Sequence, residues 1–404
     1  FVLMKLIWNM RGSLIRINCS LNISIHILRW KMRIVFLSNS YNHHQSQLSE
    51  TFYQLVGEGF KFIATKKMSI ERIKLGYPVM SPQYVVEYQE NISYAQKLID
   101  DADILICGSA PENLLRERKQ QRKVIFRYSE RPLKKGFEWW KYLYRWFMWH
   151  VTNPKALPIY MLCASAYTAE DYSKFGMFKN RCFKWGYFPE CKTYPDITDL
   201  LANKDKTEIL WCGRFLDWKH PDDAVKVARK LKDEGYTFHM NFIGTGEMDD
   251  ELRKMCSLLN LDDCVSFLGA MSPERVRHQM EKTGIYVFSS DRKEGWGAVL
   301  NEAMNSGCAV IASHEAGSTP YLINDKKNGF VYHSYDVDEL FTKLKILLGD
   351  VEKQNSMGRA AYETIVREWN AKTAAERLVH ISSQVLHNNK YFETSYETGP
   401  LSKA

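Results

Sequence analysis

The sequence lacks the cysteine pattern that marks a disulfide framework or a zinc site. Its nine cysteines are odd in number, are scattered from Cys19 to Cys308, and include no Cys-x-x-Cys pair. Scattered cysteines of this kind are typical of reduced thiols in a cytoplasmic protein. We therefore expect free thiols and a cytoplasmic location.

Long apolar runs and dense basic tracts are also missing. No uninterrupted apolar stretch reaches the ~18 residues that a membrane-spanning helix needs, so we expect no span. The net charge of +8 is spread along the chain without a dense Lys/Arg tract, which gives no support to nucleic-acid binding. A mild positive charge does suit anionic substrates or an anionic membrane surface.

The first 31 residues differ in character from the rest of the chain. The sequence begins with Phe1, and residues 1–31 mix apolar and basic side chains without the small-residue cleavage site of a signal peptide. Met32 then opens an apolar run that is typical of a first buried strand. We interpret 1–31 as an upstream or non-native extension, and a membrane-surface anchor is the alternative.

Short apolar runs alternate with helical patterns along the rest of the chain, as in parallel α/β sheets. A chain of 404 residues, 45% hydrophobic and 25% charged, is long enough for two such domains. The expected strands are 33–37, 104–107, 124–126, 160–163, 209–211, 238–243, 265–268, 285–288 and 309–312. The expected helices are 46–56, 221–233, 336–348 and one that begins at Ser272-Pro273, with Ser as N-cap.

A polar segment that contains Pro195 separates the two halves. We expect a first Rossmann-like domain over 32–190, a linker over 191–206 and a second Rossmann-like domain over 207–365. A helix over 366–388 and a flexible tail over 389–404 complete the predicted organisation.

Ligands of doubly wound sheets bind outside the carboxyl ends of the strands, so the loops at those ends matter most. In one such loop, Gly213-Arg214 and Lys219 bring two cations close to a helix N-terminus, an arrangement that suits a diphosphate. The alternative is a solvated turn. In a second loop, Gly244-x-Gly246 allows close backbone approach to a ligand, or simply forms a tight turn.

The most specific signal is the string from Glu294 to Glu302. Glu294 follows a strand, and Glu302 lies roughly one and a half turns into the next helix. Both carboxylates can then face one crevice and accept hydrogen bonds from sugar hydroxyls, while 295–297 bares backbone N–H groups at the helix N-terminus. The alternative is one carboxylate that favours the helix dipole and one exposed helical Glu.

Together these motifs resemble the donor-binding half of the retaining, group 1 type glycosyltransferases of family 4, which have the GT-B fold. The matching pieces are Gly213-Arg214 with Lys219, Gly244-x-Gly246, Phe267-Leu268-Gly269, Glu294-x7-Glu302 with 307–313, and Trp369 with 375–377 in the last helix. The resemblance spans roughly 32–386 and is looser in the first half. It implies an α/β, GT-B architecture in which two Rossmann-like domains face a central cleft. The first would bind the acceptor, the second the nucleotide-sugar donor, and the last helix would cross back to the first domain.

The resemblance also implies roles for single residues. Arg214 and Lys219 would hold the donor diphosphate and stabilise it as it leaves, and they join Glu294 and Glu130 as catalytic candidates. Glu294 would contact the donor sugar and Glu302 the ribose. The other implied donor-side residues are Gly213, Gly244, Gly246, Leu268, Gly269, Gly295, Trp296, Gly297, Ala298 and Val299.

The implied reaction moves a sugar from a UDP- or GDP-linked donor to a sugar or lipid-linked acceptor with retention, in surface polysaccharide biosynthesis. Fixed cations would stabilise the charge that grows on the diphosphate, so no cofactor and no metal is expected. Asp-x-Asp occurs at 101–103 and 336–338, and we interpret both motifs as structural. The alternatives are a nucleotide-sugar epimerase or hydrolase on the same fold, or a non-catalytic GT-B scaffold.

The acceptor half offers weaker signals. Glu130 follows the third strand within Ser-Glu-Arg, where many members of the resembled family carry His or His-Asp. It either contacts donor or acceptor, or forms an ion pair with Arg127 or Arg131. The other acceptor-side candidates are His43, His44, Ser109 and Glu112.

An aromatic stretch at 137–150 contains four tryptophans and is accompanied by Lys134, Lys135, Lys141 and Arg145. We favour a helix whose aromatic side chains pack against the domain or cap the acceptor cleft. The alternative is a helix that lies in a membrane interface, where Trp and cations are favoured, and that would suit a lipid-linked acceptor.

Overall fold

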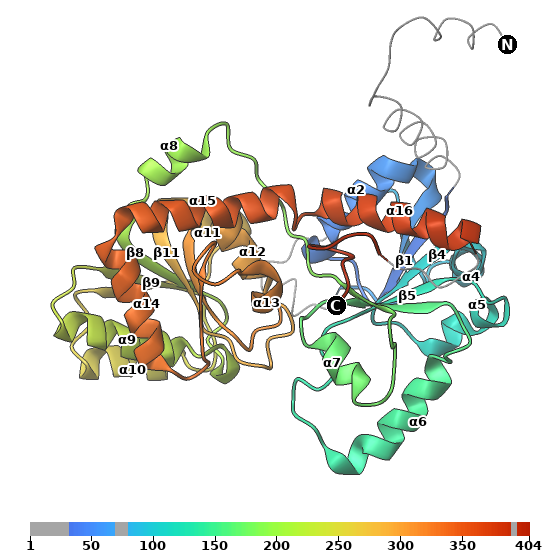
Figure 1. Ribbon diagram of the computed structural model, residues 1–404, viewed down its shortest axis with the longest axis horizontal. Helices are drawn as coiled ribbons and strands as arrows, with labels where there is room; N and C mark the ends of the chain where they lie inside the picture. Colours follow the sequence, from blue (N-terminus) through green and yellow to red (C-terminus); the bar gives the residue numbers. More distant parts are fainter. Residues whose placement is uncertain (1–31, 69–79, 389–393) are drawn as a thin grey trace, which may run out of the picture.

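The computed structural model describes residues 32–68, 80–388 and 394–404, so the predicted extension at 1–31 lies outside the described residues. Two parallel sheets with their flanking helices form two domains that lie side by side (Figure 1). No helix of the described residues is long and apolar enough to cross a membrane. The cysteines of this part of the chain are free thiols.

The first domain contains a seven-stranded sheet whose neighbouring strands all pair in parallel. Ile34 and Phe36 of the central strand belong to one hydrophobic core, and Val35 and Leu37 belong to the other. Burial on both faces explains why the strand is continuously apolar. The order across the sheet is β3 (Val85–Glu87), β2 (Phe60–Ala64), β1 (Ile34–Ser38), β4 (Ile104–Cys107), β5 (Ile125–Ser129), β6 (Ile159–Cys163) and β7 (Cys182–Lys184).

Helices connect these strands and cover the sheet. Asn42 caps the first of them by accepting the N–H of His44 at 3.0 Å, so this helix begins three residues before the predicted Ser46. The helices of this domain are α2 (His43–Val56), α4 (Ile92–Asp101), α5 (Arg116–Gln120), α6 (Tyr142–Thr152) and α7 (Thr168–Ser173).

The second domain has a six-stranded parallel sheet. Its order is β10 (Val265–Gly269), β9 (His239–Ile243), β8 (Asp205–Cys212), β11 (Thr283–Phe288), β12 (Ala309–Ser313) and β13 (Phe330–Tyr332). The strand order reverses between β8 and β11, as in a doubly wound fold. Ligand sites of such folds lie at this switch point.

The predicted helices α9, α11 and α14 begin within a residue of the predicted positions, whereas α10, α13 and α15 were not predicted. Ser272 caps α11 by accepting the N–H of Arg275 at 3.4 Å, and Pro273 occupies the first turn. Asp336 caps α14 through the N–H of Glu339 at 2.8 Å. The helices of this domain are α9 (Pro221–Asp233), α10 (Asp249–Leu258), α11 (Pro273–Lys282), α12 (Ala298–Asn305), α13 (Thr319–Leu322), α14 (Val337–Gly349) and α15 (Val351–Arg367).

Asp103 accepts the backbone N–H of Arg33 at 2.7 Å, which joins the start of β1 to the start of β4. Together with the cap that Asp336 provides, this bond gives both Asp-x-Asp motifs a structural role, as predicted.

Four strands were not anticipated, namely β2, β3, β7 and β13. β3, β7 and β13 have three residues each and lie at sheet edges, so they carry little of the apolar periodicity that a prediction uses.

The expected linker is more structured than its composition suggests. Within 191–206 the chain forms α8 (Ile197–Ala202), and β8 begins at Asp205, so the second domain starts before the predicted residue 207. Lys204 is buried there and its ammonium group donates to the carbonyl oxygens of Met280 at 2.6 Å and Thr283 at 2.9 Å. Lys204, one of the polar residues that suggested a linker, therefore anchors this segment to the second domain.

The end of the chain returns to the first domain. The last helix, α16 (Ala371–Asn388), lies along α2, as Figure 1 shows. The prediction of a flexible tail is wrong for 394–404. Leu401 and Ser402 are buried, and the backbone of Lys184 in β7 exchanges hydrogen bonds with them at 2.7 and 2.8 Å.

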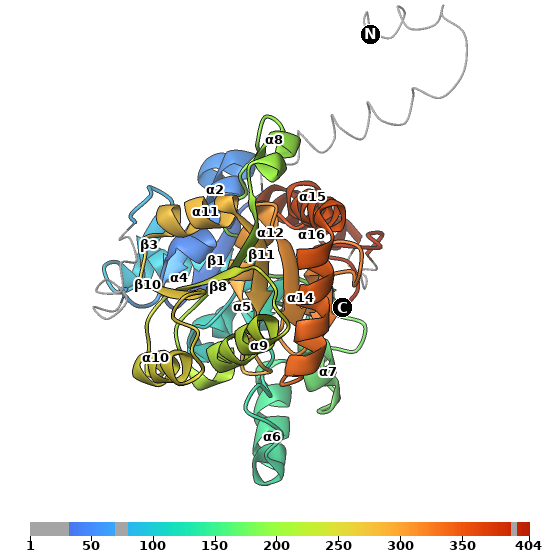
Figure 2. The same cartoon turned by 90° about the vertical axis from the view of Figure 1, so that its left-hand side faces the viewer.

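Helix α6 departs most from the favoured prediction. No residue of α6 is buried, and the helix projects away from the two domains in Figure 2. Trp139 and Leu143 are each 75% exposed. The interpretation of this stretch as an ordinary packed or cleft-capping helix is therefore wrong for most of its aromatic side chains.

The two domains meet through loops that follow the carboxyl ends of both sheets. Ala166, after β6, donates its N–H to the carbonyl of Gly317, after β12, at 2.9 Å. The Tyr167 hydroxyl donates to the carbonyl of His314, and Arg292, after β11, donates to the carbonyl of Leu133 at 3.2 Å. The carboxyl ends of the two sheets thus face each other.

Candidate active site

Four loops of the second domain converge because the strands before them, β10, β9, β8 and β11, are neighbours and run in parallel. Backbone bonds join the loops to one another. Gly213 donates to the carbonyl of Ile243 at 3.0 Å, Phe215 to that of Thr245 at 3.0 Å, and Gly244 to that of Gly269 at 2.9 Å. The motifs that lie far apart in the sequence therefore form one surface.

Gly244 is required by this convergence. Its φ is +135°, and a Cβ at this position would lie 1.9 Å from the carbonyl oxygen of Gly213. No L-side chain fits there without moving the backbone. The Gly-x-Gly motif thus lets the 213–215 loop pack directly on the 244–246 loop, and this contact sets the position of Arg214.

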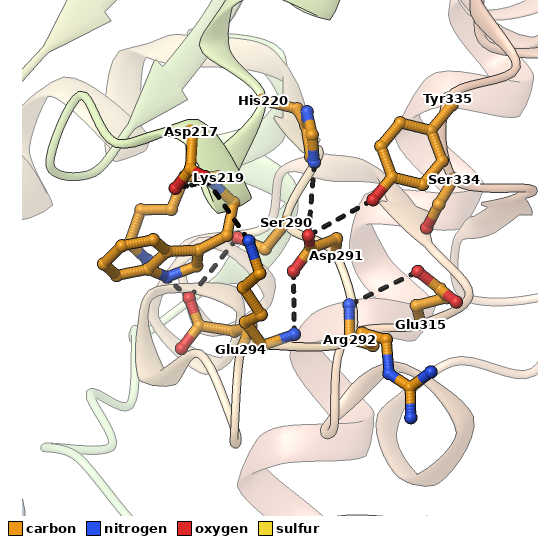
Figure 3. Close-up of polar contacts among 12 residues, drawn as sticks. Asp217, Lys219, His220, Ser290, Asp291, Arg292, Glu294, Glu315, Ser334 and Tyr335 are labelled. Atoms are coloured by element: carbon orange, nitrogen blue, oxygen red, sulfur yellow. Dashed lines mark hydrogen bonds and ion pairs between the residues drawn. The ribbon is translucent and has the colours of Figure 1, made fainter. Parts of the chain in front are cut away.

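Lys219 and Glu294, which the sequence places on different loops, form an ion pair (Figure 3). Only 15% of the Lys219 side chain and 16% of the Glu294 side chain are exposed. Ser290 adds a hydrogen bond from its hydroxyl to the same Glu294 carboxylate at 3.3 Å. The expected phosphate-binding cation and the expected sugar-binding carboxylate therefore neutralise each other.

Arg214 is exposed, and among the described residues its guanidinium forms no ion pair or side-chain hydrogen bond. Glu302 is partly buried in α12, and its carboxylate also has no hydrogen-bond partner in the described part of the chain. Burial raises the pKa of the Glu302 carboxyl above its usual value, and the charge of Arg277 offsets only part of that rise. A half-buried carboxylate without a partner is positioned to accept hydrogen bonds from a ligand.

The segment between the two glutamates forms the start of α12. Gly297 is its N-cap, Ala298 and Val299 lie in its first turn and are partly exposed, and Gly295 is buried. The Trp296 side chain belongs to the core: it is fully buried and its indole N–H donates to Asn301 at 2.9 Å. Only the backbone of Trp296 can serve a ligand.

Leu268 and Gly269 end β10 at a register shift between β10 and β9. Leu268 is 37% exposed although it lies in a strand, because the irregularity turns its side chain away from the core. The contact of Leu268 and Gly269 with the nucleotide base stays a prediction.

A brace between the Lys219 loop and the Glu294 loop was not anticipated. Asp291 accepts from Tyr335 at 3.2 Å and lies 3.5 Å from His220 Nε2, and its backbone N–H donates to the Trp218 carbonyl at 2.8 Å (Figure 3). The hydroxyl of Ser289 donates to the carbonyl of His220 at 2.9 Å. These contacts hold the Lys219 loop against the Glu294 loop. They join residues that are distant in the sequence, so no local sequence motif predicts them.

The brace is charged. Burial alone would lower the pKa of His220, but the bond to Asp291 and the charges of Asp223 and Asp222 raise it above its ordinary value. Burial alone would raise the pKa of Asp291, but His220 and the N–H of Lys293 lower it. The pair is therefore most stable when His220 is protonated and Asp291 is ionised.

The first domain contributes a cavity of about 830 Å³ at the point where its own strand order reverses, between β1 and β4. Its walls are mostly polar and come from the carboxyl ends of β1, β4 and β5, from α2 and from the end of α6. Ser38, Asn39, Asn42, His44, Ser109, Glu112, Arg127, Glu130, Lys134, Trp149, Thr152, Asn153 and Tyr187 are among its lining residues.

Glu130 connects this cavity with the loop that contains Glu294 and Gly295. Its carboxylate accepts from the Tyr187 hydroxyl at 2.8 Å and from Lys134 at 3.0 Å, and it lies so close to Gly295 that a Cβ there would clash with it. Burial and then the charge of Glu130 raise the pKa of Tyr187, which keeps its hydroxyl a donor. The predicted alternative of an ion pair with Arg127 or Arg131 is wrong.

Arg127 and Arg131 have other partners. Arg127 pairs with Glu112 at 2.7 Å, and Arg131 with the buried Asp171 at 3.3 Å. Glu112 also binds Lys119 at 2.8 Å. Glu112 therefore lines the cavity as predicted, but its carboxylate is engaged by two cations.

The remaining acceptor-side candidates differ in position. Ser109 is exposed and lines the cavity, and His44 lines it beside the ring of Tyr187, with the ring centres 6.0 Å apart. His43 packs on the His44 ring at 3.9 Å and is not part of the lining. Among the described residues no group of three or more His, Cys, Asp or Glu side chains is arranged to hold a metal ion.

The family model of group 1 glycosyl transferases matches residues 195–364. An uncharacterized glycosyltransferase of Haemophilus influenzae is 25% identical over 177 residues, which cover 42% of this chain and 49% of the relative. The amylovoran biosynthesis glycosyltransferase AmsK of Erwinia amylovora is 27% identical over 183 residues, 44% of this chain and 43% of the relative. The chain thus aligns with less than half of each of these curated relatives.

The similarity of fold extends over both domains. The crystal structure of Anabaena HepE in complex with UDP and glucose superposes with a TM-score of 0.63 at 15% identity, covering 87% of this chain and 99% of that chain. A Rickettsia africae glycosyltransferase superposes with a TM-score of 0.65 at 13% identity, covering 89% and 100%. The fold is GT-B, as predicted, with two Rossmann-like domains whose strand ends face each other.

Proposed function

We propose that this chain, whose second domain matches the group 1 glycosyl transferases, moves a sugar from a nucleotide-sugar donor to a sugar or lipid-linked acceptor. One observation carries the proposal. Lys219 and Glu294 form an ion pair between the loops that follow the adjacent parallel strands β8 and β11; Arg214 lies in the first of these loops, Glu302 lies in the helix after the second, and the cavity that holds Glu130 opens from the facing domain. Two cations and two carboxylates suit a ligand with a diphosphate and several hydroxyls.

In this proposal the Lys219–Glu294 ion pair exchanges partners when the donor binds. The diphosphate takes Lys219 and the unpaired Arg214, and a donor-sugar hydroxyl donates to Glu294. Glu302 accepts from the ribose hydroxyls. Each charged group then gains a ligand partner, so the desolvation of the donor is compensated at both ends of the molecule.

The reaction would break the bond between the sugar C1 and the diphosphate oxygen and form a bond between C1 and an acceptor hydroxyl oxygen. The acceptor proton leaves with the departing diphosphate. Negative charge grows on the diphosphate, where Arg214 and Lys219 stabilise it, and positive charge grows on the sugar ring, near Glu130. These fixed charges are the reason that the proposed mechanism requires no metal.

Three finer features rest on resemblance. Retention of configuration follows from the family 4 likeness. UDP or GDP is the proposed carrier, and UDP is the nucleotide bound in the HepE structure. A role in surface polysaccharide synthesis is supported by AmsK, a protein of amylovoran biosynthesis. We propose a cytoplasmic protein, in agreement with its free thiols.

Thermal unfolding with UDP, GDP, ADP and CMP tests the donor site. A nucleotide at ~100 times its dissociation constant adds about 2.7 kcal/mol to stability. We expect one nucleotide to raise the melting temperature of the wild type but not of Arg214→Ala or Glu302→Gln. The matched controls, Arg367→Ala and Glu251→Gln, remove the same charges from exposed helix positions that belong to none of the candidate motifs and should respond as the wild type does. If no nucleotide stabilises the protein, the scaffold alternative replaces the transferase.

A second measurement separates transfer from the other reactions of the fold. Nucleotide sugars that contain the nucleotide found to bind, and that differ in their sugar, are incubated with the protein in the presence and in the absence of acceptors. The products are then analysed by mass spectrometry. A transferase forms a glycosylated acceptor, and release of nucleotide increases when acceptor is added. Release of free sugar or a changed donor that is independent of acceptor identifies a hydrolase or an epimerase and refutes the proposal.

A further inference from the structure

The surface of α6 and of the turn before it is apolar where a helix on a protein surface is normally polar. We call this surface the aromatic face. It consists of Trp139, Trp140, Leu143, Tyr144, Trp146, Phe147 and Val151, which are between 43% and 75% exposed. A contiguous exposed apolar patch of this kind marks an interaction site.

The opposite side of α6 holds the helix firmly on the domain. The ring of Trp149 contacts the rings of Tyr172 at 4.9 Å and Phe175 at 4.6 Å, and the ring of Tyr142 stacks on Phe175 at 5.0 Å. The aromatic face is therefore presented outward by a supported helix, and Figure 2 shows α6 projecting beyond the rest of the molecule.

The charges around the aromatic face select its partner. Between residues 134 and 155 the sequence contains Lys134, Lys135, Lys141, Arg145 and Lys155, with Glu138 as the only acid. Lys141 and Arg145 share Glu138, and Lys134 pairs with Glu130, so the region keeps a net positive charge after its ion pairs are counted. A second copy of this chain would bring two such basic regions together, which like-charge repulsion disfavours. Trp, Tyr and cations together are the composition that binds the interface of an anionic bilayer.

The same helix also forms part of the acceptor-side cavity. Trp149, Thr152 and Asn153 line that cavity, and Arg127 in its wall donates to Asn153 at 2.8 Å and to the carbonyl of Thr152 at 3.3 Å. An element that binds a bilayer on its outer side would thus hold the cavity close to the headgroups.

We propose that the aromatic face docks on an anionic lipid bilayer and that the acceptor is lipid-linked, with its polar head entering the cavity beside α6. The assignment of the acceptor rests on the function proposed above, whereas the docking of α6 does not. Donor binding in the second domain and lipid binding by α6 can therefore be tested separately.

Flotation with vesicles tests the docking. We expect the full chain to float with vesicles of phosphatidylcholine mixed with phosphatidylglycerol and to stay behind with phosphatidylcholine alone. The triple variant Trp139→Ser/Leu143→Ser/Phe147→Ser should lose roughly tenfold or more in binding, because three interfacial side chains are removed. The control pair, Leu258→Ser and Lys254→Glu on exposed positions of α10, should float as the wild type does.

The position of the cavity is tested with lipids that carry a quencher on the headgroup. A fluorophore attached to Ser109→Cys, at the cavity, should lose fluorescence when the protein binds these vesicles. The signal of the wild type labelled in the same way is subtracted to remove the contribution of the native thiols. A label on Asp199→Cys in α8, which lies at the opposite end of the molecule from α6 in Figures 1 and 2, should not be quenched.

Three outcomes would overturn this inference. The triple variant could float like the wild type, or the wild type could float equally well with and without phosphatidylglycerol in the vesicles. Light scattering could instead show that the wild type is a dimer and the triple variant a monomer, which would make the aromatic face a contact between two copies of the chain. An unchanged melting temperature and an unchanged response to nucleotide show that the variant is folded, so a loss of flotation cannot be confused with failure of the donor site.

Discussion

Replacing Glu294 by Gln separates the two partners that we assign to Lys219. In the structure the Glu294 carboxylate pairs with the Lys219 ammonium group, and both side chains are largely shielded from water. A diphosphate that binds Lys219 has to displace this carboxylate. We therefore expect Glu294→Gln to bind a bare nucleoside diphosphate more tightly than the wild type and to transfer sugar more slowly.

The size of the two effects is set by the contact. Opposite unit charges ~4 Å apart attract by about 4 kcal/mol at an effective dielectric constant of 20, and exposed pairs are worth about 1 kcal/mol or less after desolvation and side-chain entropy. We take about 1 kcal/mol for the lost competition, which is roughly a fivefold gain in affinity for the diphosphate. A hydrogen bond to a charged group contributes about 1.5–3 kcal/mol, so transfer should fall by roughly tenfold or more.

Titration calorimetry with the nucleoside diphosphate that stabilises the protein measures the first effect, and initial rates with the corresponding nucleotide sugar measure the second. Glu251→Gln removes the same charge from an exposed position of α10 and controls for the change in net charge. Higher salt should reduce the difference between Glu294→Gln and the wild type, because the competition is electrostatic.

The reasoning is refuted if Glu294→Gln binds the diphosphate no better than Glu251→Gln does. That result would mean that the diphosphate does not compete with Glu294 for Lys219. A gain in affinity with unchanged transfer would refute the second half, the contact between Glu294 and the donor sugar.

Three further predictions concern single positions. Gly244→Ala places a Cβ 1.9 Å from the Gly213 carbonyl oxygen at a φ of +135°, which should lower the free energy of unfolding by roughly 1–3 kcal/mol. The melting temperature should therefore fall, and nucleotide should stabilise the variant less than it stabilises the wild type. Glu130→Gln should keep the nucleotide response and lose roughly 100-fold in the rate of transfer; an unchanged rate removes Glu130 from the reaction. Because the pKa of His220 is raised in the folded state, its protonated imidazole stabilises the fold, and this contribution is fully present below about pH 6.5. The contribution is lost as the pH rises through the raised pKa. The difference in melting temperature between the wild type and His220→Gln should thus shrink as pH rises above about 6.5, and a difference that grows with pH contradicts the brace with Asp291.

The sequence by itself determined the elements that depend on local pattern. Continuous apolar runs predicted β1, β4 and β12 to within a residue, because strands buried on both faces of a parallel sheet have no polar side. Ser272-Pro273 predicted the start of α11 through backbone capping alone. Similarly, the spacing from Glu294 to Glu302 predicted a loop carboxylate followed by a helical one, since it spans a single strand–loop–helix unit.

Only the tertiary structure decided which distant groups meet. The Lys219–Glu294 pair, the Asp291 brace with His220 and Tyr335, and the contact of Glu130 with Gly295 all join loops from different strands or domains. Local pattern carries no information on such pairs, because sheet order and domain packing set their distances. The same reason explains the errors. The tail at 394–404 is ordered by pairing with β7, and α6 packs on the domain through Tyr142 and Trp149 while its aromatic face is exposed.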